Sequence, residues 1–208
     1  MPYDPERVIS YIETREPAAE TYAHQYAMFV TWEVLRQYLA DQPACVLANR
    51  FLYYARGLPR LRVLPDVMVI LGVTPGERDS YQTWEEGRAP TVIFEMTSAQ
   101  TLAADQGDKK DLYEAMEIPE YWLFDPRGEC LNPPLVGYQL IGDDYHVIPD
   151  NISHVLQLRL VPNGALIDFY RLDSGEKLLT PAELAQERQR HLALLEKLRA
   201  QGITPDTL

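Results

Sequence analysis

Two acidic residues stand inside or beside apolar runs, where the sequence pattern predicts aliphatic side chains. Glu95 lies within APTVIFEMTS, residues 89–98, and Asp66 directly precedes VMVIL, residues 67–71. Such runs of β-branched and aromatic residues are typical of buried strands. A carboxylate buried there must be paired, hydrogen-bonded or bound to a metal. One interpretation is a structural ion pair. The other is an oxygen-rich site on neighbouring strands, of the kind that Mg²⁺ or Mn²⁺ prefers.

A lysine is the third charged residue in an apolar context. Residues 105–116, DQGDKKDLYEAM, have helical periodicity, which places Lys109 on the buried face and turns Lys110 about 100° round, towards Glu114 and solvent. A strand–helix connection would bring the start of this helix close to the end of the strand before it, so the long side chain of Lys109 could reach the carboxylates. The alternative is a lysine that packs its aliphatic stem and pairs with Asp105 or Asp108.

The elements that must position these residues follow from the apolar pattern. Helices are expected over 17–39, 105–116 and from Thr180 onwards, where TPAE forms a capping box. Strands are expected over 44–55, 61–71, 81–84, 91–98, 121–124, 135–141, 145–148, 155–161 and 165–170. The strand–helix–strand unit implies a parallel pair with a right-handed crossover, and the last four strands suggest an antiparallel meander.

These elements predict an α/β (α+β) protein with a mixed β-sheet core flanked by helices, followed by a β-meander and a C-terminal helix. The 208 residues, of which 46% are hydrophobic, are enough for one sizeable core. We therefore expect one domain over residues 1–174 and a helical extension over 175–208. No apolar run reaches the roughly 18 residues that a membrane helix needs, and residues 1–6 lack the features of a signal peptide. A cytoplasmic protein is the expectation.

Charge and cysteine content narrow the function further. The formal net charge of −12 argues against non-specific nucleic-acid binding. Between residues 42 and 64, however, there is no acidic residue and there are four basic ones, Arg50, Arg56, Arg60 and Arg62. They form either a solvated strand face or a surface that binds nucleic acid. The two cysteines are far apart and outside any CxxC motif, which argues against a zinc site and a disulfide framework.

Three motifs together resemble a known family. They are Pro65-Asp66, the segment FEMTS that contains Glu95, and the pattern DxxxKxxxYxxxxIPEYWLFDP over residues 105–126. In this combination the chain is similar to the Uma-type restriction endonucleases, a family expanded in cyanobacteria that belongs to the PD-(D/E)XK nuclease superfamily. The superfamily pattern places a lysine two residues after the glutamate, where this chain has Thr97. In the Uma-type branch the lysine lies in the following helix, where this chain has Lys109.

The resemblance implies a restriction-endonuclease-like fold and metal-dependent hydrolysis of DNA. Asp66, Glu95 and the backbone carbonyl of Met96 would hold Mg²⁺ or Mn²⁺, and Glu20 corresponds best to the helical glutamate of the superfamily. Lys109 would orient the attacking water or stabilise charge on the phosphate. Because nucleases that cut both strands commonly pair two active sites, and the helix after Thr180 offers an apolar stripe, we expect a homodimer.

A second interpretation belongs to a different class of function. The chain could be a non-catalytic interaction protein that retains a nuclease fold and assembles through its C-terminal helix. The two interpretations differ in whether Asp66, Glu95 and Lys109 converge in space. The four histidines show no paired metal-binding spacing, and each is more typical of a surface or core histidine; they are His24, His146, His154 and His191. Tyr113 is likewise more typical of a core residue than of a base-stacking one.

Overall fold

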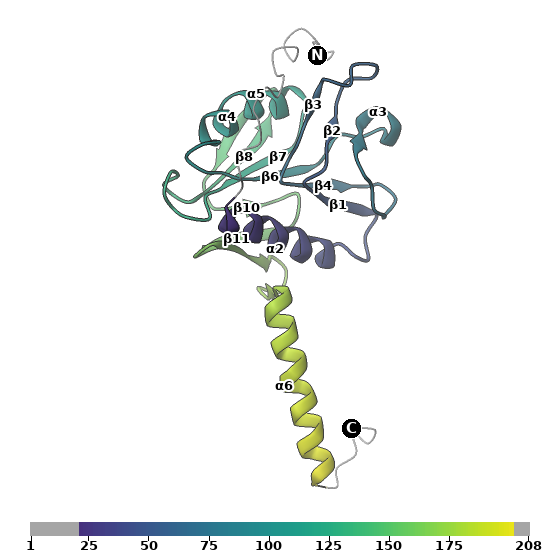
Figure 1. The fold of residues 1–208 in the computed structure, drawn as a ribbon, viewed down its shortest axis with the longest axis vertical. Helices are drawn as coiled ribbons and strands as arrows, with labels where there is room; N and C mark the ends of the chain where they lie inside the picture. Colours follow the sequence, from purple (N-terminus) through teal and green to yellow (C-terminus); the bar gives the residue numbers. More distant parts are fainter. Residues whose placement is uncertain (1–20, 202–208) are drawn as a thin grey trace. The chain divides into compact units, whose positions relative to one another are not determined.

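The computed structural model describes residues 21–201. Its main element is a six-stranded mixed sheet with strand order β1-β4-β6-β7-β8-β9 (Figure 1). The strands are β1 (Ala44–Ala48), β4 (Val67–Leu71), β6 (Val92–Met96), β7 (Glu120–Phe124), β8 (Leu135–Ile141) and β9 (Asp144–Ile148). Strands β6 and β7 are parallel and every other neighbouring pair in this sheet is antiparallel. The parallel pair predicted from the strand–helix–strand pattern is therefore confirmed.

Two smaller sheets lie beside the main one. The first has the order β10-β11-β12-β13, with bounds Ile152–Ser153, Leu158–Asn163, Leu166–Arg171 and Lys177–Leu178. The second has the order β3-β2-β5, with bounds Arg62–Val63, Leu52–Tyr53 and Tyr81–Gln82. The prediction of one continuous meander was wrong, because β8 and β9 extend the main sheet whereas the later strands form a separate sheet. The apolar side chains of Leu158, Leu160 and Phe169 explain this, since they are buried in the core below the main sheet.

Several predicted elements are divided in the structure. The expected strands over 44–55 and 61–71 each split in two, because Asn49 adopts a left-handed conformation with φ of 51° and Pro65 interrupts the second run. The predicted helix over 105–116 also splits, into α4 (Leu102–Gln106) and α5 (Asp108–Ala115). Gly107 lies at the break, and a Cβ atom there would approach the carbonyl oxygen of Ala103 to 2.9 Å. The short expected strand over 81–84 gives way to α3 (Thr83–Glu86) after two residues.

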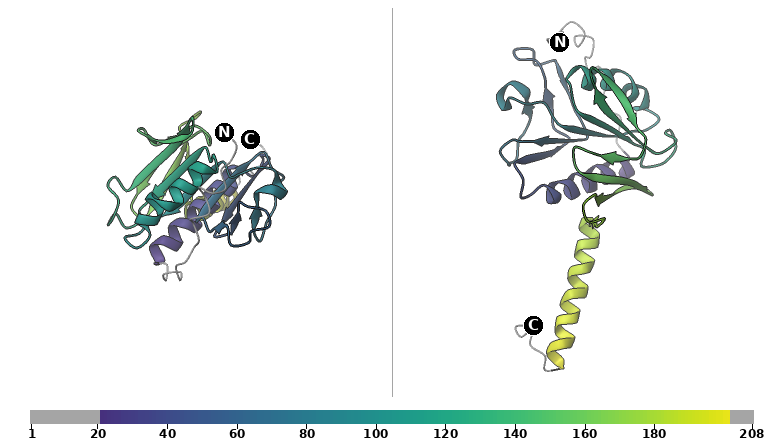
Figure 2. Two further views of the ribbon diagram at one scale, coloured as in Figure 1. Left: turned by 90° about the horizontal axis from the view of Figure 1, so that it is seen from above. Right: turned by 180° about the vertical axis from the view of Figure 1, so that it is seen from behind.

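The main sheet is covered on both faces. Helix α2 (Tyr22–Tyr38) and the sheet β10–β13 lie on one face, and α4, α5 and the sheet β2, β3 and β5 lie on the other (Figures 1 and 2). Along β6 the side chains alternate between these two cores: Phe94 and Met96 belong to the α2 side, and Ile93 belongs to the α5 side. This alternation decides where Glu95 points.

The chain divides into two compact units that meet between Leu178 and Leu179. The second unit contains α6 (Pro181–Ala200), whose N-terminus is closed by the predicted capping box. Thr180 Oγ1 accepts a hydrogen bond from the Glu183 amide, and the Glu183 carboxylate accepts one from the Thr180 amide. Among the helices of residues 21–201, none is long and apolar enough to cross a membrane.

Candidate active site

The register between β4 and β6 brings Asp66 to Glu95. Val67 lies opposite Phe94 in this antiparallel pair, so Asp66, one residue earlier, faces the end of β6. The amide of Asp66 donates a hydrogen bond of 3.4 Å to Oε2 of Glu95, and the amide of Met96 donates one of 2.6 Å to Oδ2 of Asp66. The two acids that stood out in the sequence are therefore neighbours, joined through backbone amides.

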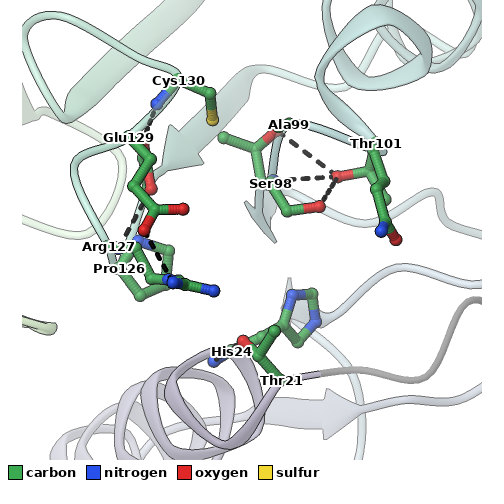
Figure 3. Close-up of a pocket in the computed structure, with 12 residues that line it drawn as sticks. Thr21, His24, Ser98, Ala99, Thr101, Pro126, Arg127, Glu129 and Cys130 are labelled. Atoms are coloured by element: carbon green, nitrogen blue, oxygen red, sulfur yellow. Dashed lines mark hydrogen bonds and ion pairs between the residues drawn. The ribbon is translucent and has the colours of Figure 1, made fainter.

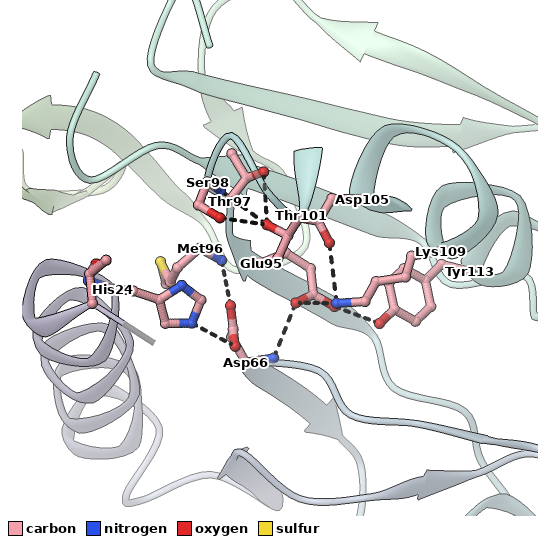
Figure 4. A network of polar contacts seen from close by, with 11 residues as sticks. His24, Asp66, Glu95, Met96, Thr97, Ser98, Thr101, Asp105, Lys109 and Tyr113 are labelled. Atoms are coloured by element: carbon pink, nitrogen blue, oxygen red, sulfur yellow. Dashed lines mark hydrogen bonds and ion pairs between the residues drawn. The ribbon is translucent and has the colours of Figure 1, made fainter. Parts of the chain in front are cut away.

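Glu95 points into the core on the α5 side. It shares the face of Ile93 because side chains alternate along β6. Its carboxylate is 1% exposed and contacts two residues of α5 that are one turn apart. Lys109 Nζ lies 3.0 Å from Oε2, and the hydroxyl group of Tyr113 donates a hydrogen bond of 2.7 Å to Oε1 (Figure 4). The structure thus joins Asp66, Glu95 and Lys109 in one network, to which it adds Tyr113.

Lys109 has a second acidic partner in Asp105. Its Nζ atom lies 3.2 Å from Oδ1 of Asp105, whose side chain is 2% exposed. That oxygen accepts no hydrogen bond of normal geometry from the described residues, so the ammonium group is its charge partner by distance alone. Both interpretations of Lys109 from the sequence therefore apply: it pairs with an aspartate of the preceding helix and also reaches Glu95.

Lys110 differs from its predicted environment. Its Nζ atom lies 3.8 Å from Glu114, as the helical spacing suggested. The same atom lies 5.4 and 5.6 Å from the ring centroids of Tyr138 and Tyr145, and the side chain is 22% exposed. The predicted direction towards Glu114 is therefore confirmed, but Lys110 is less open to solvent than predicted, because β8 and the edge strand β9 supply aromatic rings on that side of α5.

The electrostatic balance of the network is negative. Two carboxylates, from Glu95 and Asp105, contact the single ammonium group of Lys109, and a third, from Asp66, lies next to Glu95, whose Oε2 accepts a hydrogen bond from the Asp66 amide. Burial raises the pKa of Glu95 from its ordinary value of 4.5 to about 8, although Lys109 acts against the shift. The charges of Asp66 and Asp105 raise this pKa further, and the hydrogen bond from Tyr113 lowers it. A buried carboxylate in such surroundings takes up a proton or requires an additional cation.

Helix α2 contributes His24, which the sequence had placed among ordinary surface or core histidines. Its Nε2 atom lies 3.1 Å from Oδ1 of Asp66 (Figure 4). Thr21, the N-cap of α2, accepts a hydrogen bond from the His24 amide and so fixes the first turn that presents the imidazole. The available signal was that His24 follows Glu20 by one helical turn. Glu20 itself, the predicted helical ligand, lies outside the described residues.

The four arginines between β1 and β4 have two kinds of environment. Arg62 lies over the ring of Phe51, with 4.0 Å between its Cζ atom and the ring centroid, and it donates a hydrogen bond to the hydroxyl of Tyr53. Its role in packing is therefore clear. Arg50, Arg56 and Arg60 are exposed.

A polar pocket of about 210 Å³ adjoins the network at His24 and Thr97 (Figure 3). Because β6 and β7 are parallel, the loops after both strands meet at one edge of the sheet and form its walls. Asp125, in the second loop, accepts hydrogen bonds from four amides: Oδ1 from Arg127 and Gly128, and Oδ2 from Cys130 and Leu131. This carboxylate holds the shape of the loop. The lining residues are Thr21, His24, Thr97, Ser98, Ala99, Gln100, Thr101, Asp125, Pro126, Arg127, Glu129 and Cys130.

Comparison with known proteins adds the decisive observation. A family model described as "Uma2: Putative restriction endonuclease" matches residues 13–198. The chain belongs to this family. The Uma2 match covers the network, the pocket and most of α6, and it confirms the resemblance drawn from the three sequence motifs. Among curated proteins, none matches the chain. Among solved structures, the chain is similar to "a putative nuclease belonging to DUF820" from Anabaena variabilis ATCC 29413, with 15% identity, a TM-score of 0.46, and coverage of 74% of this chain and 79% of that one.

Proposed function

We propose that this Uma2 protein is a divalent-metal-dependent endonuclease that hydrolyses phosphodiester bonds of DNA. The observation that carries the proposal is the position of Glu95. A glutamate at the end of a central strand contacts the amide of Asp66 on one side and the ammonium group of Lys109 on the other. In a chain of a restriction-endonuclease family, this combination of two acids and a lysine is the chemical equipment that metal-assisted phosphodiester cleavage requires.

The residues present fit a hard divalent cation. Two of the three carboxylates in the network contact its one lysine, so the site carries an excess of negative charge that a cation would offset. Asp66, Glu95 and the backbone carbonyl of Met96 would hold the ion, and all three offer the oxygen atoms that Mg²⁺ and Mn²⁺ prefer. Within residues 21–201, no three acidic, histidine or cysteine side chains already surround one point. Water and phosphate oxygens would therefore complete the coordination, as is usual for Mg²⁺. When bound, the ion would polarise the phosphate and lower the pKa of a bound water.

Side chains of the protein would supply the other catalytic and binding roles. Lys109 would orient the attacking water or stabilise charge that develops on the phosphate, because its ammonium group lies beside the carboxylate of Glu95. Tyr113 would keep that carboxylate in place through its hydrogen bond to Oε1. The pocket next to His24 and Thr97 would receive the DNA backbone through its hydroxyl groups and through Arg127, whose guanidinium group is paired with Glu129 of the same wall. Arg50, Arg56 and Arg60 would contact phosphates further along the duplex.

A homodimer is part of this proposal, because nucleases that cut both strands commonly pair two active sites. Helix α6 has no buried residue, and Leu184, Leu192 and Leu194 are exposed on it. Such apolar residues on a 20-residue helix support association with a second copy. Light scattering on the full chain and on a variant that ends at Leu178 tests this, because β13 remains intact in the shorter chain. A full-length monomer would contradict the dimer.

Two buried glutamates on adjacent strands allow a matched test of the function. Glu95 is the penultimate residue of β6, whereas Glu120 begins β7 and accepts hydrogen bonds from Trp122, Ser153 and the Val155 amide. Glu95→Gln should abolish cleavage of supercoiled plasmid with Mg²⁺ or Mn²⁺ and remove the rise in melting temperature that the metal causes. Glu120→Gln should lower stability and preserve both metal-dependent properties. Equal behaviour of the two variants would contradict the proposal.

A non-catalytic interaction protein is the second candidate function. One observation favours it: both oxygens of Glu95 already have partners within the chain. The buried carboxylate is therefore accounted for by structural contacts alone, without a catalytic role. This candidate predicts that the wild-type chain cuts neither plasmid nor single-stranded DNA with Mg²⁺ or Mn²⁺, while α6 still mediates association.

A further inference from the structure

His24 contacts a proposed metal ligand, Asp66, but the proposed division of work gives it no role. Its Nε2 atom and Oδ1 of Asp66 are 3.1 Å apart, and each side chain is 12% exposed. The other oxygen of Asp66 is occupied by the Met96 amide at 2.6 Å. The imidazole therefore meets the only carboxylate oxygen of Asp66 that does not bind the β6 backbone.

The separation of these two atoms is the separation of two ligands on one ion. Ligand atoms about 2.1 Å from a six-coordinate cation, at right angles to each other, lie about 3.0 Å apart. The observed 3.1 Å, which is also a hydrogen-bond distance, is close to this value. His24 also lines the polar pocket, so its ring stands between Asp66 and the space proposed for the phosphate.

The geometry points to His24 as a direct ligand, through Nε2, of the divalent ion in the proposed nuclease, and to Mn²⁺ rather than Mg²⁺ as the ion that the site prefers. This inference rests on the proposed function for the identity of the site. An all-oxygen ligand set does not separate the two ions strongly, whereas an imidazole nitrogen favours first-row transition ions and suits Mg²⁺ poorly. Helix α2 thereby supplies a ligand from the described part of the chain, independently of Glu20.

Binding of Mn²⁺ to the full chain tests the inference without any substrate. Pulsed electron paramagnetic resonance detects a histidine nitrogen bound to Mn²⁺ as ¹⁴N modulation of the electron spin echo. The comparison includes the wild type, His24→Ala, His24→Asn and, as matched control, His146→Ala, since His146 is an exposed histidine of β9. Competition between Mn²⁺ and Mg²⁺ gives the relative affinities, and melting curves in EDTA verify that each variant folds.

Nitrogen modulation in the wild type and in His146→Ala, and its loss in both His24 variants, would confirm the ligand. His24→Ala should also weaken Mn²⁺ binding by roughly 10- to 100-fold and Mg²⁺ binding by less. His24→Asn covers the case in which the alanine variant does not fold, because it retains a polar side chain without an imidazole. The assignment is wrong if the wild type binds no Mn²⁺, binds it without nitrogen modulation, or keeps the modulation when His24 is replaced.

Plasmid cleavage, measured in parallel, separates this inference from the proposed function. A wild-type chain that cuts DNA but shows no nitrogen modulation would refute the role of His24 and leave the nuclease intact. A chain that shows the modulation but cuts no DNA would establish the His24 site and refute the nuclease.

Discussion

The hydroxyl group of Tyr113 donates a hydrogen bond of 2.7 Å to Oε1 of Glu95, and both side chains are almost completely buried. Lys109, one turn earlier on α5, contacts the other oxygen of the same carboxylate. A single helix therefore holds both oxygens of Glu95. Tyr113, which the sequence suggested was an ordinary core residue, therefore also holds the carboxylate of the candidate site in position.

Tyr113→Phe should reduce cleavage without abolishing it, because it releases Oε1 of Glu95 but preserves Lys109. It should also lower the free energy of unfolding by about 1–3 kcal/mol, since a buried acceptor loses its donor. Tyr121→Phe is the matched control: its hydroxyl is also buried but donates to the carbonyl oxygen of Asp105. Urea unfolding and plasmid cleavage are measured for both. Equal losses of activity would show that Tyr113 acts through general stability.

Lys109→Ala should abolish metal-dependent cleavage while the fold remains intact. The substitution removes the ammonium group beside Glu95 and Asp105. A bound metal ion can partly replace the positive charge and so preserve the fold. It cannot replace the proposed action of the ammonium group on the phosphate. Lys110→Ala should preserve cleavage. It should lower stability by about 0.5–1 kcal/mol, because it removes the interaction with the rings of Tyr138 and Tyr145. If both variants cut like the wild type, Lys109 has a structural role only.

Asp125 should contribute stability that depends on pH. Burial acts to raise its pKa, but hydrogen bonds from Cys130, Leu131 and Arg127 outweigh burial and hold the pKa below its ordinary value of 3.8. The ionised form is therefore favoured by folding. Its contribution is present in full above the pKa of the unfolded chain and is lost as the pH falls through the lower pKa of the folded chain.

Asp125→Asn should consequently destabilise the protein at about pH 7 by more than at about pH 2.5. Urea unfolding at the two pH values measures the difference, with Asp143→Asn as the control because Asp143 is exposed. A stability difference between wild type and Asp125→Asn that is independent of pH would contradict the assignment.

The exposed arginines between β2 and β3 should contribute to DNA binding through phosphates. Replacing Arg56 and Arg60 by alanine should weaken binding of a labelled duplex and reduce the slope of log K against log salt by about 1 for each phosphate that an arginine neutralises in the wild type. Fluorescence anisotropy in EDTA measures binding without cleavage. Arg159→Ala, on β11 of another sheet, should leave the slope unchanged. If the slope is unchanged in the double variant, Arg56 and Arg60 lie on a solvated surface that does not contact DNA phosphates.

The sequence predicted the part of the site that depends on local pattern. Asp66, Glu95 and Lys109 were conspicuous because each is a charged residue in an apolar context, and the strand–helix–strand order was enough to predict that β6 and β7 are parallel. The structure supports their proximity through the register of Val67 with Phe94. Their catalytic roles stay predictions.

His24 could not be found in the same way. It lies in the first turn of a helix, where a histidine has no unusual neighbours in the sequence, and it meets Asp66 only because α2 packs across the end of β4. The break at Gly107 was missed for a related reason: the apolar period continues through it, and only the backbone conformation ends α4 there. Tertiary packing decides the first feature, and local backbone conformation decides the second.

Strand β6 has hydrogen-bonded neighbours on both sides, β4 and β7, and its residues are all buried. Amides in such a strand exchange with deuterated water only when the whole domain opens, whereas amides in a loop exchange through small local openings. The amides of the strand that carries Glu95 and Met96, and of Thr97, which donates to the carbonyl oxygen of Phe124, should therefore retain their protons longest, and those of the exposed residues 99–100 should lose them earlier. The residue proposed to hold the ion would thus lie on the most protected strand of the sheet, a few residues before an exposed loop.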